Sequence, residues 1–230
     1  TARRQQAPLT VVGEAEVASL PGGASCPLGL VGPHQRLNAA LAVATLRAVA
    51  GPLGIQVEES VVARGLAEVR WPGRMQVVRR AEGGTVLLDG AHNPDGVEAL
   101  VAALRETFPG TRPALVLGVL ADKEWERMIQ ALAPIAGQIV AVPVQSQRTL
   151  DPGVLRDACA AACPSTPCTV AAGAAAALAS LRGEPLVLVA GSLYLIGEAL
   201  EALGARLMPG GGERGLNEWG GAGQPGERVD

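Results

Sequence analysis

Polar side chains follow an apolar run near the middle of the chain, where residues 86–96 read VLLDGAHNPDG. The run stops at Asp89, and His92 and Asn93 come shortly after it. We interpret the segment as a strand, a sharp turn and a helix, because Pro94 suits the first helical position and Asn93 can cap it. Ligands of open α/β sheets bind beyond the carboxyl ends of the strands, so this cluster indicates polar chemistry. The alternative is that Asp89 and Asn93 only cap the turn and the helix, while His92 is an exposed loop residue.

Other places in the chain offer side chains that suit an anion. His34 and Asn38 lie on the first turn of an expected helix, where free N–H groups and the helix dipole attract negative charge. Arg74 follows a rigid Trp-Pro-Gly loop, and its planar guanidinium suits phosphate. Arg148 lies in a loop where it can bind a substrate carboxylate, and Ser192 opens a helix with free N–H groups. Ordinary surface or capping roles remain the alternatives, and Ser192 lacks the Gly-x-Ser-x-Gly elbow of a serine hydrolase.

Asp122 and Lys123 follow a strand that is expected to end at Leu120. We interpret Asp122 as the cap of the next helix and Lys123 as a solvated side chain. A contact of this pair with a ligand is the alternative.

A regular alternation of strands and helices should position these residues. Apolar strands are expected near 85–88, 114–119, 138–142, 167–170 and 186–190, with helices near 94–107, 123–133, 151–162, 173–181 and 192–204. Such repeats predict an α/β fold with a mostly parallel, doubly wound, Rossmann-like sheet and helices on both faces. Two further helices, near 33–50 and 58–69, are expected before the repeats begin.

The order of these patterns predicts four parts. Short β-like pieces at 9–12 and 28–31 surround a Pro-Gly-Gly turn, and we interpret them as the last strands of a second domain. Because the chain begins with neither Met nor the apolar core of a signal peptide, we expect it to be truncated. The predicted parts are an amino-terminal domain remnant (1–31), linker helices (32–73), a carboxy-terminal α/β domain (74–206) and a glycine-rich disordered tail (207–230).

Composition limits the classes of function. Apolar residues make up 48% of the 230 residues, which allows a sizeable core, and the formal net charge of −3 comes without a basic cluster, so we expect no nucleic acid partner. The longest apolar run is too short to cross a bilayer, so we expect no membrane association and a cytoplasmic protein. The cysteines form no Cys-x-x-Cys pair, which favours free thiols over a metal site; they are Cys26, Cys159, Cys163 and Cys168.

Five motifs in order resemble the folylpolyglutamate synthase and dihydrofolate synthase family, within the Mur ligase superfamily. The resemblance covers residues 25–204. The motifs are GPHQxxNA (32–39), WPGR (71–74), LDGAHNP (88–94), DK (122–123) and GSLYLIGE (191–198).

The resemblance implies a ligase that uses ATP and Mg²⁺ to join L-glutamate to a folate or dihydropteroate carboxylate through an acyl phosphate. It implies that Asn38 and Asp89 contact the adenosine and that Arg74 contacts the phosphates. His92 would be the catalytic residue near the transferred phosphate and the incoming glutamate, and Ser192 would help to hold glutamate. It assigns no metal ligand to this chain.

One departure from the family is the absence of a Gly-x-x-x-x-Gly-Lys-Ser/Thr phosphate loop in the 230 residues. We therefore expect that the chain requires the missing amino-terminal ATPase domain and has no ligase activity alone. Two other functions remain open. One is a Mur-type cell-wall ligase, whose signature usually has an Asp-Tyr pair where Asp89 and Gly90 stand here. The other is a non-catalytic α/β ligand-binding module.

Overall fold

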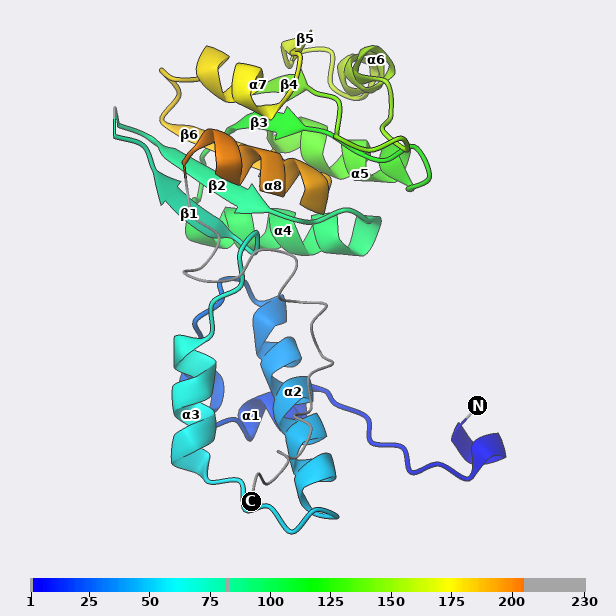
Figure 1. Cartoon of the computed structure of the whole chain (residues 1–230), viewed down its shortest axis with the longest axis vertical. Helices are drawn as coiled ribbons and strands as arrows, with labels where there is room; N and C mark the ends of the chain where they lie inside the picture. The colour runs from blue at the N-terminus through cyan, green and yellow to red at the C-terminus, as the bar shows by residue number, and fades with distance from the viewer. Residues whose placement is uncertain (1, 82, 205–230) are drawn as a thin grey trace, which may run out of the picture.

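Six strands form a single sheet in the order β1-β2-β6-β3-β4-β5 (Figure 1). The structure, a computed structural model, describes residues 2–81 and 83–204. β1 runs antiparallel to β2, and all other neighbouring strands are parallel, which confirms the predicted α/β fold. The strands are β1 Gln76–Arg79, β2 Thr85–Asp89, β3 Ala114–Leu117, β4 Gln138–Ala141, β5 Cys168–Val170 and β6 Leu186–Ala190.

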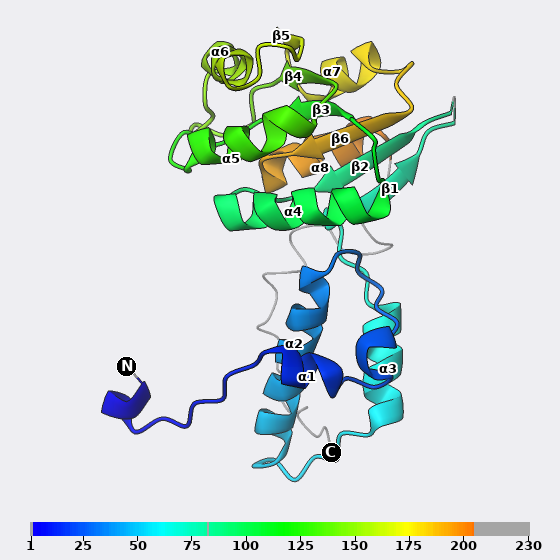
Figure 2. The same ribbon diagram turned by 180° about the vertical axis from the view of Figure 1, so that it is seen from behind.

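Helices cover both faces of the sheet, and the inner strands β2, β6, β3 and β4 are accordingly apolar and buried on both sides. Alternate residues of β2 enter different cores: Leu87 packs with α4, α5 and α6, whereas Val86 and Leu88 pack with α7 and α8. Figure 2 shows α4 and α5 in front of the sheet. The helices are α4 Pro94–Thr107, α5 Trp125–Leu132, α6 Pro152–Ala162, α7 Ala174–Ser180 and α8 Leu193–Ala202, with a short 3₁₀ helix at Ala133–Ile135.

β1 is the strand that the sequence did not predict. It is an edge strand with alternating half-buried and exposed residues, and it carries Gln76 and Arg79 at its ends. A strand of four residues with polar ends gives little apolar signal, and its identity depends on pairing with β2, which lies further along the chain.

A smaller helical body lies beside α4 (Figure 1). Its own core is small and includes Leu20, Cys26, Val43 and Val62, so residues on both sides of the boundary predicted at 31 share it. The elements are a 3₁₀ helix at Ala2–Gln5, α1 Glu14–Ala18, a 3₁₀ helix at Gly23–Ser25, α2 His34–Ala50 and α3 Glu59–Glu68.

The strands predicted at 9–12 and 28–31 are wrong. No described residue in 2–31 belongs to a strand, and Leu9 and Val11 are exposed. A strand is stabilised by a paired neighbour, and no neighbouring strand lies beside either segment in the described part of the chain. The tail predicted to be disordered, 207–230, lies outside the described residues. Within residues 2–81 and 83–204, no helix has both the length and the apolar character needed to cross a bilayer.

Candidate functional site

The turn between β2 and α4 is held by the Asp89 side chain. Its Oδ2 accepts a hydrogen bond from the Met75 N–H, and its Oδ1 accepts one from the Ala91 N–H, both at 2.9 Å. Asp89 is 6% exposed, so these bonds satisfy a buried carboxyl group. Asn93 accepts from the Gly96 N–H at 2.7 Å with Pro94 at the first helical position, which confirms the predicted cap of α4.

A glycine at the end of β6 lets three chain segments meet beside this turn. The Gly191 N–H donates to the Ala91 carbonyl at 3.0 Å, and Gly191 has φ +110°. A Cβ atom at this position would lie 2.5 Å from the Gly118 carbonyl oxygen. Only glycine therefore combines the required backbone conformation with this close approach.

A cavity of about 290 Å³, which we call the Asp89 cavity, lies between the helical body and α4. It brings together the three residues that the sequence predicted to contact nucleotide, which are Asn38, Arg74 and Asp89. They come from the first turns of α2, the loop before β1 and the end of β2, respectively. The cavity is lined by Leu30, His34, Gln35, Asn38, Trp71, Arg74, Asp89, Gly96, Ala99 and Leu100.

A hydrogen-bonded chain runs along the α2 side of the Asp89 cavity. Asn38 Nδ2 donates to Gln35 Oε1, and Gln35 Nε2 donates to His34 Nε2, both at 3.0 Å. Gln35 is buried although it is polar. The sequence analysis assigned it no role, yet residues three apart face the same side of a helix, so its spacing from Asn38 was the available signal.

Burial shifts the protonation of two groups in the Asp89 cavity. Burial raises the pKa of Asp89 above its ordinary value, against the Met75 and Ala91 N–H groups and the Arg74 charge, which lower it. Burial lowers the pKa of His34, and Arg74 adds to this effect while Asp89 opposes it. The cavity therefore favours a neutral imidazole beside a guanidinium, an arrangement that leaves the arginine as the cation available to an anion.

A second cavity of about 160 Å³, the His92 cavity, adjoins the other side chains predicted to bind substrate. His92 Nδ1 donates to the Gly90 carbonyl at 2.7 Å, which leaves Nε2 free to exchange a proton. Ser192 Oγ accepts from the Tyr194 N–H at 3.2 Å and so caps α8. The lining residues are His92, Leu120, Lys123, Arg148, Ser192, Leu193 and Tyr194.

The helix cap predicted at Asp122 is wrong. Glu124 occupies the cap position of α5, and the Asp122 carboxylate instead accepts a hydrogen bond from Arg148 at 2.8 Å. The antiparallel bridge between Leu120 and Thr149 brings these two loops together. The helix begins at Trp125, later than the start near 123 that was predicted, so Asp122 lies too far from the first helical N–H groups to cap them. Lys123 lines the His92 cavity, so its side chain is not simply solvated.

The predicted site residues occupy two cavities and not one. Asp89 and His92 lie three residues apart on the same turn, yet Asp89 lines the first cavity together with Arg74, and His92 lines the second together with Arg148. The buried Asp89 carboxyl is bound by its two backbone donors, whereas the His92 ring bonds back to Gly90. The turn thus presents its two functional groups in different directions.

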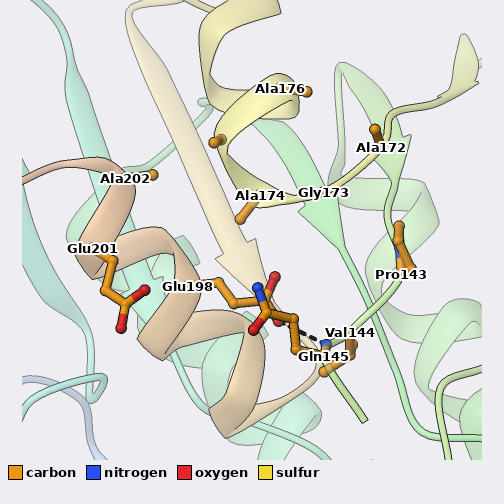
Figure 3. A pocket seen from close by; sticks show the side chains of 11 residues that line it. Pro143, Val144, Gln145, Ala172, Gly173, Ala174, Ala176, Glu198, Glu201 and Ala202 are labelled. Carbon is orange, nitrogen blue, oxygen red and sulfur yellow. Dashed lines mark hydrogen bonds between the residues drawn. The ribbon is translucent and has the colours of Figure 1, made fainter. Parts of the chain in front are cut away.

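A third cavity, of about 420 Å³, contains none of the predicted site residues (Figure 3). It lies between the loops after β4 and β5 and the side of α8. Glu198 accepts a hydrogen bond from the Gln145 N–H at 2.8 Å, which ties α8 to the loop that carries Arg148. Glu198 belongs to the GSLYLIGE motif, so this motif contributes to both the second and the third cavity.

Comparison with known proteins places this geometry in a family. The family model described as "Mur ligase, glutamate ligase domain" matches residues 73–193. The chain is 30% identical to folylpolyglutamate synthase of Lacticaseibacillus casei over 184 residues, which is 76% of this chain and 39% of that protein. The chain therefore spans about two fifths of the length of that relative.

Solved structures of similar proteins also match this chain. The structure of Mycobacterium tuberculosis folylpolyglutamate synthase complexed with ADP has a TM-score of 0.67 and 31% identity, and the match covers 77% of this chain and 41% of that chain. Escherichia coli FolC in complex with DHPP and ADP has a TM-score of 0.65 and 27% identity, with 78% and 41% covered. The matches confirm the resemblance predicted from the five motifs.

Proposed function

Because this chain belongs to the Mur ligase family and carries its glutamate ligase domain, we propose that it supplies the glutamate side of a cytoplasmic folylpolyglutamate or dihydrofolate synthase. The reaction would proceed in two steps. A folate or dihydropteroate carboxylate oxygen attacks the γ-phosphorus of ATP, which gives an acyl phosphate and ADP. The amine of L-glutamate then attacks the acyl carbon, phosphate leaves, and the amine loses a proton as the amide forms.

The observation that carries this proposal is the position of the two cavities on one turn. Asp89 and His92 are three residues apart, so a nucleotide in the Asp89 cavity and a glutamate in the His92 cavity would approach each other across the start of α4. Holding two reactants at adjacent positions supplies much of the acceleration in a ligation of this kind. ADP in the Mycobacterium tuberculosis structure supports a nucleotide as one of the two ligands.

On the nucleotide side, we assign Asn38 and Asp89 to the adenosine and Arg74 to the phosphates. The carboxamide and the carboxyl group supply donors and acceptors for the nucleoside, and a guanidinium binds phosphate oxygens with two parallel hydrogen bonds. Gln35 holds the carboxamide of Asn38 in place. We assign it the role of a positioning residue.

On the glutamate side, Arg148 and Lys123 offer cationic groups to a dicarboxylate, and the exposed ion pair between Arg148 and Asp122 can exchange one carboxylate for another. His92 Nε2 can take the proton that the glutamate amine loses, since Nδ1 is held by Gly90. Ser192 lines the same cavity, and its hydroxyl is held by the capping bond from the Tyr194 N–H.

Magnesium, when bound, neutralises charge on the phosphates during phosphoryl transfer. The described residues include no group of three or more His, Cys, Asp or Glu side chains that could hold a metal ion. The 230 residues contain no Gly-x-x-x-x-Gly-Lys-Ser/Thr phosphate loop. We propose that the chain alone binds substrates without ligating them.

Calorimetric titration with ADP and with L-glutamate tests these assignments. We expect Arg74→Ala and Asp89→Ala to weaken ADP binding about tenfold or more, and His92→Gln to leave it unchanged. Arg182 is exposed and lines a different cavity, so Arg182→Ala is the matched control for lost positive charge. Wild-type ADP affinity in Arg74→Ala and Asp89→Ala would refute the nucleotide assignment. Release of ADP by the chain alone with ATP, glutamate and dihydropteroate would refute the requirement for a further domain.

A further inference from the structure

Three of the four cysteines gather around the turn that joins α6 to β5, at Cys159, Cys163 and Cys168. Cys159 lies in the core, and the residues Cys163 and Cys168 are half-buried at its edge. None of them lines any of the three cavities described above. This cluster therefore has no part in the proposed ligation.

Thr166 makes a different kind of hydrogen bond to Cys163 and to Cys168. Its hydroxyl donates to Cys163 Sγ at 3.1 Å, whereas its carbonyl accepts from Cys168 Sγ at 3.3 Å. A donor stabilises a thiolate and an acceptor stabilises a thiol. The turn thus holds Cys163 ready to lose its proton while Cys168 keeps its own.

An arginine completes the arrangement around Thr166. Arg112 donates to the Ala136 carbonyl at 2.7 Å and to the Thr166 hydroxyl oxygen at 3.4 Å. Thr166 is buried, and its hydroxyl donates its one proton to Cys163 while the hydroxyl oxygen accepts from the Arg112 guanidinium. Hydrogen bonds from Thr166 and Ser165 lower the pKa of Cys163, and the Arg112 charge adds to this effect.

The neighbouring thiols have the opposite tendency. Burial raises the pKa of Cys168, and the nearby Cys163 adds to it. Burial raises the pKa of Cys159 to about 12, so this thiol stays protonated and unreactive. The turn therefore places one thiol that loses its proton readily beside one that keeps its proton, and the third thiol, Cys159, is buried and unreactive.

We propose that Cys163 and Cys168 form a peroxide-sensitive dithiol site that closes into a disulfide. The Cys163 thiolate attacks one oxygen of hydrogen peroxide, the O–O bond breaks, and the departing hydroxide takes up a proton to become water, which leaves a sulfenic acid. The Cys168 sulfur then loses its proton and attacks the Cys163 sulfur, the S–O bond breaks, and a second water leaves. Two thiols are oxidised and one peroxide is reduced.

The location of the site predicts its effect. Cys168 begins β5, an edge strand, so the bond would link this amino end to the end of α6, at the opposite rim of the sheet from the carboxyl ends that carry Asp89 and Ser192. We expect oxidation to slow amide hydrogen exchange in 159–170 and to leave the Asp89 and His92 cavities unchanged, because neither is near this rim.

Peroxide treatment of the full chain, followed by thiol counting under denaturing conditions, tests the proposal. We expect the wild type to lose two of its four thiols and to regain them with dithiothreitol. Mass spectrometry of the tryptic peptide 157–182 should show the loss of two hydrogens and no backbone fragmentation between 163 and 168. Cys159→Ala and Cys26→Ala should keep this bond.

Substitutions at Cys163, Cys168 and Thr166 test the role of each residue in the dithiol site. Cys163→Ser should lose no thiols to peroxide, and Cys168→Ser should accumulate a Cys163 sulfenic acid that dimedone traps. Thr166→Val should slow the reaction with peroxide about tenfold, since thiolate fraction controls the rate, and Thr166→Ser should restore it. The proposal is overturned if the wild type retains all its thiols, if Cys163→Ser loses them equally, or if the bond formed joins two chains.

Discussion

The sheet body and the helical body bury their apolar side chains to very different extents. The central strands β3 and β6 are buried along their whole length, between two layers of helices. In the helical body, by contrast, a series of large apolar side chains remains exposed on α2, on α3 and in the loop between them. These are Leu37, Leu41, Leu46, Val49, Leu53, Ile55 and Val61.

The contrast indicates where stability and where function reside. A stable domain packs at least two layers of secondary structure around a core, and the sheet body meets this condition while the helical body has a core of few residues. The Asp89 cavity takes residues from both bodies. The proposed nucleotide site thus joins a rigid part, which holds Asp89, to a weakly packed part, which holds Asn38.

The largest expected effect is a cavity in the centre of the sheet body. Leu188 on β6 is fully buried, so Leu188→Ala should lower the free energy of unfolding by about 3 kcal/mol. The matched substitution Leu41→Ala on α2, where the side chain is 53% exposed, should cost less than about 0.5 kcal/mol. Urea unfolding measures both. Equal losses would mean that the two bodies are packed alike.

The next largest loss of stability is expected at Gly191, beside the β2–α4 turn. Gly191→Ala adds a Cβ atom 2.5 Å from the Gly118 carbonyl oxygen at a positive φ, and we expect a loss of about 2 kcal/mol. Gly183→Ala has open space around its Cβ position and serves as the control. Thermal unfolding distinguishes them. A Gly191→Ala variant as stable as Gly183→Ala would contradict the close approach.

A smaller loss of stability is expected when a helix cap is removed, and two caps show whether this loss also affects the site. Asn93 caps α4 beside the site and Asp151 caps α6 away from it, and each change to Ala should cost about 1 kcal/mol. We expect only Asn93→Ala to weaken binding of ADP or glutamate as well, because it loosens the turn that carries Asp89 and His92. Calorimetry and urea unfolding of both variants measure this, and matching ligand affinities would show that the turn does not depend on its cap.

The smallest effect is a pH dependence at the junction of the two bodies. The pKa of His34 is lowered by burial, so below its ordinary value of 6.5 the unfolded chain takes up this proton before the folded chain does. The contribution of His34 to the free energy of unfolding is therefore present above pH 6.5 and is lost as the pH falls below this value. His34→Gln should lose less stability than the wild type between pH 7.5 and 5.5 in urea unfolding. A steeper loss in the variant would reverse this sign.

Local sequence signals predicted much of the sheet body. The apolar runs that became β2 and β6, and the Asn93–Pro94 pair that starts α4, each depend on neighbours within a few residues. β1 was not predicted and the strands at 9–12 and 28–31 were predicted wrongly, because pairing between distant segments decides whether a short run becomes a strand.

In the candidate site too, features set by local sequence were predicted and features set by contacts between distant residues were not. The motifs identified Asn38, Arg74 and Asp89, and the structure brings these three together. The ion pair between Asp122 and Arg148 was not predicted, because it links residues whose proximity only the fold determines. The division into two cavities likewise depends on which way each side chain of one turn points, and residue spacing does not specify this.

The claim on which the account depends is that a nucleotide binds in the Asp89 cavity, where the sheet body meets the helical body and on the same turn as the His92 cavity. Titration of the ¹⁵N-labelled chain with ADP, followed by backbone amide shifts, tests it most directly. We predict saturable shifts confined to residues 30–38, 71–76, 89–96 and 191–194, which line or adjoin the two cavities. Shifts centred instead on Arg79, Arg80 and Arg182, which line a cavity elsewhere on the sheet body, would contradict it.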